Sequence, residues 1–213
     1  MHKGVIVFGV CDLTKDSLDI FQKNNLIVYG ILEDATQWHH TTIHNIPVLG
    51  ATDDPAFLAL LNEACASFIA YRHKQKRKNC FNVLSAQQKY TSISAIHPSA
   101  IIAETIQLGT GNYIGAQACL ASAVTIGNHC ILHNGVIIES ETNIHDWVEI
   151  GAGSVIGDHV TLEEDVFIGM GASIMPGVTI QKGASIGAGS VVLGNVKSGD
   201  VLLGNPAKPI QHP

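Results

Sequence analysis

The sequence predicts an α/β domain followed by a three-sided solenoid of short parallel strands. Strand and helix patterns alternate over residues 1–92, whereas an aliphatic residue recurs at every sixth position through most of 93–213. A period of six belongs to neither a helix nor a simple alternating strand. Glycine supplies 21 of 213 residues, which is typical of a frame with many tight turns. We therefore expect two domains, residues 1–92 and 93–213.

In the first domain, short apolar runs alternate with helical patterns. The expected strands are Val5–Phe8, Leu26–Leu32, Ile46–Gly50 and Ser67–Tyr71, and the expected helices are Asp12–Lys23 and Asp54–Cys65. Runs of this kind are typical of buried parallel strands, and their alternation with helices predicts a parallel sheet with right-handed crossovers.

In the second domain, every sixth position from Ile96 to Val192 is Ile, Leu or Val, which gives 17 aliphatic positions. The position four residues later mostly holds a small or β-branched side chain. This pattern fits a prism whose sides are short strands and whose corners are turns, with the aliphatic side chains inside. Three hexads close one coil, so the repeat predicts about five to six coils stacked about 4.8 Å apart.

Composition excludes several classes of protein. The net charge of −6 argues against nucleic acid as the main partner, because phosphate contacts need a basic face. No apolar run approaches the roughly 20 residues that cross a bilayer, so we expect no membrane partner. Five cysteines form no CxxC pair, and their odd number favours reduced thiols in the cytoplasm.

Four segments carry a resemblance to a known family: Ile6–Gly9, Ile46–Gly50, Ile96–Ala100 and Gly204–Lys208. With the six-residue repeat, they make nearly the whole chain similar to the hexapeptide-repeat sugar acyltransferases. Members of this family acetylate bacterial nucleotide-linked amino sugars and, in relatives, sialic acid. The resemblance implies a Rossmann-like domain that binds a nucleotide sugar, then a left-handed parallel β-helix. It also implies a homotrimer, with acetyl-CoA as co-substrate in the groove between two rods.

The resemblance places the nucleotide part of the substrate near the first Gly-rich turn of the N-terminal domain. The candidate substrate-binding residues are Gly9, Asp12, Lys15, Glu33, Asp34 and Tyr71. An amide-rich turn before a helix can bind a diphosphate, and an acid at the end of the second strand can bond a ribose or uracil. The alternative for the two acids is a solvated turn. The basic stretch 72–78 lies either near the diphosphate or at an exposed helix start.

The family's catalytic base is a histidine, and counting through the hexads places Ser140 at that position. Glu141 follows it as a proton acceptor or a holder of the ammonium group. The nearest replacement base is His133, whose alternative is an exposed corner histidine. The resemblance assigns the oxyanion donor to the backbone N–H of Asp158, and it places Glu149 where the family has a second histidine at the acetyl end of the cofactor.

The expected cofactor groove continues along the rod toward the C-terminus. Its candidate residues are Glu149, Gly151, Gly157, Asp158, Gly169, Met170, Gly187, Ala188 and Lys208. The lysines of this domain all lie in its last part, at positions 182, 197 and 208, where the nucleotide end of CoA would lie. The alternative explanation of those charges is solubility.

The missing histidine favours an amine as the acetyl acceptor. A sugar hydroxyl needs a base as it attacks a thioester, whereas a neutral amine is already nucleophilic. We therefore expect N-acetylation of a UDP-linked 4-amino-4,6-dideoxy sugar of the bacillosamine type. The alternatives are a sugar or sialic acid O-acetyltransferase and a non-catalytic sugar-nucleotide-binding scaffold. A zinc enzyme on this fold needs three converging histidines, so we expect no metal.

Overall fold

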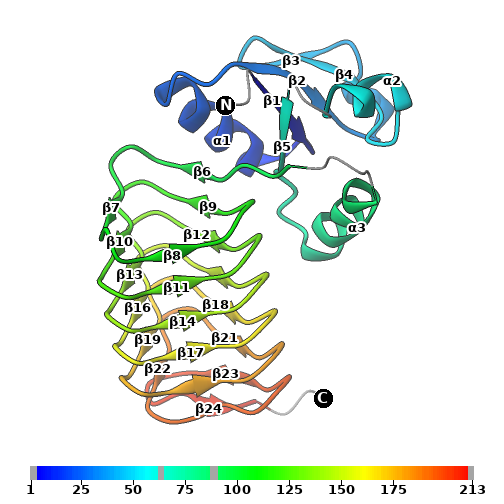
Figure 1. Ribbon diagram of the computed structural model, residues 1–213. Coiled ribbons are helices and arrows are strands. Elements are labelled where there is room, and N and C mark those ends of the chain that lie inside the picture. Colours follow the sequence, from blue (N-terminus) through cyan, green and yellow to red (C-terminus); the bar gives the residue numbers. More distant parts are fainter. Residues whose placement is uncertain (1–3, 62–64, 87–90, 211–213) are drawn as a thin grey trace. The chain divides into compact units, whose positions relative to one another are not determined.

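The computed structural model describes residues 4–61, 65–86 and 91–210. The chain divides into two compact units, residues 1–95 and 96–213 (Figure 1). The division falls three residues after the boundary expected from the change in sequence pattern.

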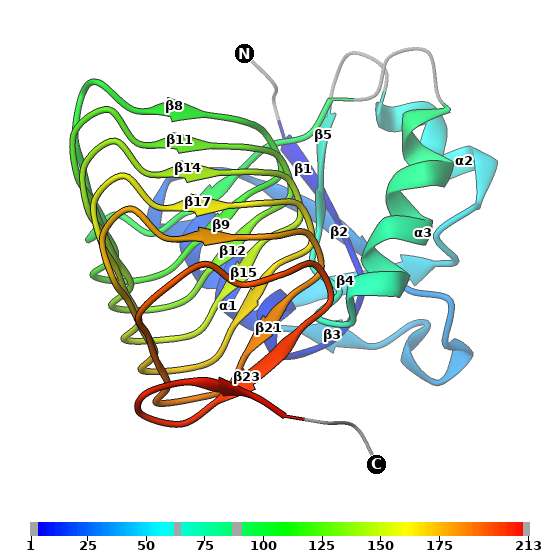
Figure 2. The same cartoon turned by 90° about the horizontal axis from the view of Figure 1, so that it is seen from below.

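The first unit is a five-stranded sheet with helices on both faces (Figure 2). Its strands are β1 (Gly4–Phe8), β2 (Val28–Leu32), β3 (Thr42–Ile43), β4 (Ile46–Gly50) and β5 (Cys65–Ile69), in the order β3-β4-β2-β1-β5. Its helices are α1 (Asp12–Lys23), α2 (Pro55–Leu58) and α3 (Lys74–Ser85), with short 3-10 turns η1 (Thr36–Trp38) and η2 (Ala59–Leu61). All neighbouring strands are parallel except β3 and β4.

The two faces of this sheet have separate apolar contacts. On one face, Phe21 of α1 meets Phe68 of β5 edge to face, with ring centroids 5.4 Å apart. On the other face, α2, η2 and α3 pack on β1 and β5, where Phe8 and Leu84 are fully buried. The apolar runs of the sequence are therefore buried strands, as their composition predicts.

Some element bounds differ from the expected ones. Strand β2 begins at Val28 rather than Leu26, because the Leu26 N–H still donates to the Phe21 carbonyl as the chain leaves α1. The expected helix 54–65 is a short one, α2, continued by η2, and residues 62–64 lie outside the described part. The basic stretch enters α3, whose Arg77 is buried.

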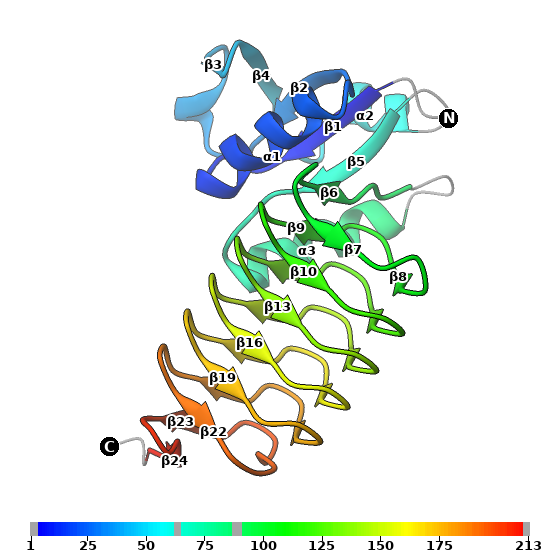
Figure 3. The same ribbon diagram turned by 90° about the vertical axis from the view of Figure 1, so that its left-hand side faces the viewer.

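The second unit is a left-handed parallel β-helix with three ladders of two-residue strands (Figure 3). Sheet 1 contains β7 (Ile101–Ile102), β10 (Cys119–Leu120), β13 (Ile137–Ile138), β16 (Val155–Ile156), β19 (Ser173–Ile174) and β22 (Val191–Val192). Sheet 2 contains β8 (Gln107–Leu108), β11 (Thr125–Ile126), β14 (Asn143–Ile144), β17 (Thr161–Leu162) and β20 (Thr179–Ile180). Sheet 3 contains β6 (Ala95–Ile96), β9 (Tyr113–Ile114), β12 (Ile131–Leu132), β15 (Glu149–Ile150), β18 (Phe167–Ile168), β21 (Ser185–Ile186), β23 (Val201–Leu203) and the antiparallel β24 (Lys208–Pro209).

Equivalent positions lie 18 residues apart, so Leu120, Ile138 and Ile156 stack on one another in register. The inward aliphatic ladder predicted by the six-residue period is confirmed, and its members from Ile114 onward are buried. The first coil, which contains Ile102 and Leu108, is only partly buried because a further coil covers it on one side alone.

Three corners join the sheets, and we name them by their residues. Corner A follows sheet 1 and contains residues 121–123, 139–141, 157–159 and 175–177. Corner B follows sheet 3 and contains residues 115–117, 133–135, 151–153, 169–171 and 187–189. Corner C follows sheet 2 and contains residues 109–111, 127–129, 145–147, 163–165 and 181–183. In each of these turns (109–111, 121–123 and so on), the third residue has a positive φ, and half of these residues are glycine.

Candidate functional site

Two hollows in the described part of the first unit lie at the carboxyl ends of β1, β2 and β5, each with a volume of 440 Å³. Both are lined by Glu33, Ala35, Tyr71 and Lys76. Strand β1 lies between β2 and β5. The connection from β1 to β2 therefore runs along the sheet in one direction, and the connection from β4 to β5 runs in the other. Ligands of open α/β sheets bind at such a switch point, outside the carboxyl ends of the strands.

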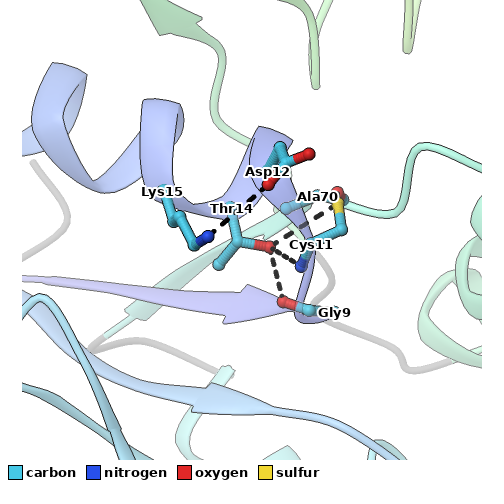
Figure 4. Close-up of polar contacts among 6 residues, drawn as sticks. All are labelled: Gly9, Cys11, Asp12, Thr14, Lys15 and Ala70. Atoms are coloured by element: carbon cyan, nitrogen blue, oxygen red, sulfur yellow. Dashed lines mark hydrogen bonds and ion pairs between the residues drawn. The ribbon is translucent and has the colours of Figure 1, made fainter.

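The turn after β1 is fixed by the hydroxyl of Thr14 (Figure 4). This hydroxyl donates to the Gly9 carbonyl at 2.8 Å and accepts from the Cys11 N–H at 3.0 Å. Gly9 has a φ of 106°, and a Cβ there would lie 2.8 Å from the ring of Tyr71. Only glycine therefore suits this position. Asp12 and Lys15 lie on the exposed side of α1, with their charged atoms 3.5 Å apart.

The two acids after β2 are held differently. The Glu33 carboxylate is buried, and its oxygens accept from the N–H groups of Val10 at 2.8 Å and Ala35 at 3.1 Å. Asp34 is exposed, and its Oδ1 accepts from the N–H and the hydroxyl of Thr52. Glu33 thus ties the ends of β1 and β2 together, whereas Asp34 presents its carboxylate at the rim of one hollow.

Tyr71 forms part of the wall between the two hollows. Burial raises the pKa of its hydroxyl far above the ordinary value, and the nearby carboxylates of Glu33 and Asp34 raise this pKa further. Tyr71 is therefore a hydrogen-bond donor at any physiological pH. The ammonium group of Lys76 lies 5.9 Å from the centre of the same ring. Burial also raises the pKa of the neighbouring Cys80 thiol, to about 12.

The rim of one of these hollows carries two cationic side chains, Arg72 and Lys76, and a histidine, His73. All three are exposed. They belong to the basic stretch 72–78, so this stretch contributes side chains to the hollow as well as forming the start of α3.

In the second unit, corner A brings together Ser140, Glu141 and Asp158 with a fourth residue, His159. The His159 Nδ1 lies 3.3 Å from Glu141 Oε2, and its Nε2 lies 3.8 Å from Asp158 Oδ2. The His159 N–H donates to the Ser140 carbonyl at 3.0 Å. His159 is not among the site residues predicted from the sequence, although its spacing from Glu141 indicates the contact. It lies 18 residues after Glu141, and that spacing places two residues on adjacent coils of one corner.

His133 lies on corner B, away from Ser140 and Glu141, which lie on corner A of the same coil. Its Nε2 is 3.2 Å from Glu149 Oε1, and both side chains are mostly buried, at 21% and 15% exposed. The ring of Tyr113 lies beside it, with the centroids 6.2 Å apart. Two of the candidate residues, His133 and Glu149, thus form a pair of their own within one chain.

Close stacking of the coils explains the glycines of the expected cofactor groove. A Cβ on Gly151 would lie 2.5 Å from the backbone nitrogen of Met170, and one on Gly169 would lie 2.5 Å from that of Ala188. Gly157 and Gly187 have similar close contacts with Pro176 and Leu203. Each glycine lets the next coil approach. The remaining candidates, Met170, Ala188 and Lys208, have exposed side chains on this part of the rod.

A third hollow of 600 Å³ lies on the outer face of sheet 2, and no residue predicted for the site lines it. Over residues 4–61, 65–86 and 91–210, no three His, Cys, Asp or Glu side chains are grouped so as to hold a metal ion. No helix within the same ranges combines the length and the apolar character needed to cross a membrane.

Two family models match the solenoid. Residues 106–140 match the hexapeptide repeat of succinyl-transferase, and residues 159–194 match the bacterial transferase hexapeptide (six repeats). No curated protein sequence gives a significant match.

Several solved structures match nearly the whole chain. A histidine-to-alanine variant of GDP-perosamine N-acetyl transferase from Caulobacter crescentus, in complex with CoA and GDP-perosamine, is 25% identical, with a TM-score of 0.89 over 98% of this chain and 97% of that one. The acetyltransferase domain of PglB from Neisseria gonorrhoeae, with acetyl coenzyme A, is 21% identical, with a TM-score of 0.88 over 99% and 100%. WeeI from Acinetobacter baumannii is 22% identical, with a TM-score of 0.85 over 97% and 99%.

The repeat matches cover the solenoid, and the structural likeness extends over both units. The chain thus contains hexapeptide repeats of the bacterial transferase type, and its fold is that of these sugar N-acetyltransferases.

Proposed function

We propose that this protein transfers the acetyl group of acetyl-CoA to the amine of a nucleotide-linked amino sugar. The observation that carries the proposal is the likeness of both units together to the Caulobacter enzyme, whose structure holds CoA and GDP-perosamine. A β-helix alone occurs with many activities, so the fold of the first unit narrows the substrate to a nucleotide sugar.

In the first unit, exposed cationic side chains support binding of a nucleoside diphosphate better than the N–H groups of the first turn do. The N–H groups of Val10 and Cys11 already donate to Glu33 and Thr14. The exposed cations Arg72 and Lys76 at the rim of the hollow supply the positive charge that a diphosphate needs. Asp34 at the rim of a hollow is an acceptor for a ribose or a base, whereas the Tyr71 hydroxyl already has a hydrogen bond to Glu33.

The outer faces of the rod support a homotrimer. On sheet 1, Ile101, Ile137 and Val155 point outward and are exposed, whereas the outward residues of sheet 2 are polar. Exposed apolar side chains in one row mark an interaction surface. With sheet 1 facing a three-fold axis, corner A of one rod lies beside corner B of the next. CoA in that cleft would pass the pair formed by the partner's His133 and the partner's Glu149.

The acceptor that we propose is the amine of a UDP-linked 4-amino-4,6-dideoxy sugar of the bacillosamine type. A neutral amine attacks the thioester carbonyl without prior loss of a proton, and holding two substrates in one cleft supplies a large part of the acceleration. The developing oxyanion would be stabilised by the backbone N–H of Asp158, one coil below Ser140.

A panel of acceptors tests the proposal. The protein is incubated with acetyl-CoA and a UDP- or GDP-linked 4-amino sugar, and free thiol is measured together with the mass of the sugar. We expect thiol release in equal amount to the N-acetylated product. The matched acceptor has a hydroxyl in place of the amine. Thiol release with that hydroxyl sugar alone would assign an O-acetyltransferase. Binding of CoA and sugar without release from any acceptor would assign a non-catalytic scaffold.

A further inference from the structure

We propose that His159 is the general base of this acetyltransferase, and that Glu141 orients its ring. The inference rests on the proposed function and deepens it, because it assigns the proton acceptor at the corner where Ser140 stands. Nothing in the sequence comparison assigns a role to His159, which lies one coil below the expected position.

His159 contacts two residues of the coil above, Ser140 through its backbone and Glu141 through its side chain. The backbone of the residue is tied to the upper coil by the hydrogen bond from the His159 N–H to the Ser140 carbonyl, at 3.0 Å. From that anchor the side chain reaches Glu141, with 3.3 Å between Nδ1 and Oε2. The imidazole thus approaches Glu141, which is adjacent in sequence to the residue that His159 would replace.

The same two residues adopt a backbone conformation that side chains rarely accept. Glu141 has a φ of 58° and His159 a φ of 56°. The coil below has glycine at the equivalent position, Gly177, and the coil above has Ala123. Corner C has side chains in the same conformation on three adjacent coils, at His129, Trp147 and Asp165, so the positive φ belongs to the repeat. The contact between their side chains is what distinguishes Glu141 and His159 on corner A.

The charges around the ring define which nitrogen accepts the proton. Glu141 Oε2 is the nearer carboxylate oxygen and faces Nδ1, so in the proposed mechanism Nδ1 carries the ring proton and Nε2 is the acceptor. Asp158 Oδ2 lies 3.8 Å from Nε2, too far for a hydrogen bond. Glu139 adds a third carboxylate on this corner, while residues 121–123 and 175–177 on the adjacent coils carry no charge. A histidine held in one tautomer by a carboxylate is a recurrent general base.

A single base is sufficient for the transfer step, because the proton that it takes from the amine is returned to the thiolate. The neutral amine attacks the thioester carbonyl carbon, so that the C–N bond forms and the carbonyl oxygen becomes an oxyanion. The ammonium nitrogen then gives one proton to His159 Nε2. The oxyanion re-forms the carbonyl, the C–S bond breaks, and the imidazolium returns the proton to the departing thiolate. The products are the N-acetyl sugar and CoA with a free thiol.

The test compares two histidines of the same rod. His159→Asn removes the base, and His145→Asn is the matched control, because His145 is an exposed histidine on corner C. We expect His159→Asn to lower kcat at least tenfold with an unchanged KM for acetyl-CoA, and His145→Asn to leave both unchanged. Added imidazole should restore part of the lost rate to His159→Ala, but it should not accelerate the wild-type protein. Glu141→Gln should lower kcat less than His159→Asn does.

The outcomes separate this inference from the proposed function. If the wild-type protein acetylates the amino sugar and His159→Asn works within twofold of it, the inference is overturned and the proposed function stands. A lower kcat that comes with a lower melting temperature and no rescue by imidazole assigns a structural role and also overturns it. If the wild-type protein binds CoA but acetylates no acceptor, the proposed function itself fails.

Discussion

The change Gly169→Ala tests why glycine recurs at corner B. A Cβ at this position would lie 2.5 Å from the backbone nitrogen of Ala188 and 2.8 Å from its Cα, so the next coil has to move. Overpacking of this kind costs about 1–3 kcal/mol, and the loss of backbone freedom in the unfolded chain offsets about 0.4–1 kcal/mol of it. We expect a net loss of about 1–2 kcal/mol, which corresponds to a fall in Tm of roughly 2–8 °C for a chain of this size.

Gly194→Ala is the matched control, because no atom lies within 4 Å of the Cβ that it adds. Thermal unfolding of both variants, followed by circular dichroism, gives the difference. We expect Gly194→Ala to leave Tm unchanged or to raise it slightly. If Gly169→Ala is as stable as that control, the close packing of the coils is not the reason for glycine, and contact with CoA becomes the better explanation.

Other predictions concern the rod surface and the first unit. Ile137→Glu combined with Val155→Glu puts charge on sheet 1, and we expect light scattering after size exclusion to show monomers in place of trimers. Glu33→Gln weakens the acceptor of two backbone N–H groups, so the midpoint of urea unfolding should fall, whereas the exposed Glu104→Gln should leave it unchanged. The Cys80 thiol has a pKa raised from 9.0 to about 12, so it keeps its proton in the folded chain where the unfolded chain loses it. The free energy of unfolding should therefore fall between pH 9 and 12, and it should fall less in Cys80→Ala.

The solenoid was predictable because its period follows from its geometry. Each hexad supplies one side of the prism, so every sixth side chain faces the interior. Ile138 and Ile150 are buried for this reason. The strands of the first unit were predictable for the same reason, since an apolar run such as Val5–Phe8 has to be buried. Their bounds shifted where a helix end held the chain, as it does at Leu26.

The candidate site was only partly predictable. Counting along the chain grouped His133 with Ser140, but residues seven positions apart fall on different corners of a coil. Residues 18 or 19 positions apart share a corner, which is why His159 lies beside Glu141. In the first unit, the spacing of Glu33 and Asp34 gave no indication that one carboxylate is buried among backbone N–H groups and the other is exposed.

The most direct test of the account is a crystal structure of the protein with CoA. We expect three rods around one axis, with sheet 1 inside and the thiol of CoA between corner A of one protomer and corner B of its partner. His159 would then face the thiol from one side and the partner's Glu149 from the other. CoA bound elsewhere, for example in the hollow on sheet 2, would contradict the proposed arrangement, and so would a monomer with sheet 1 open to solvent.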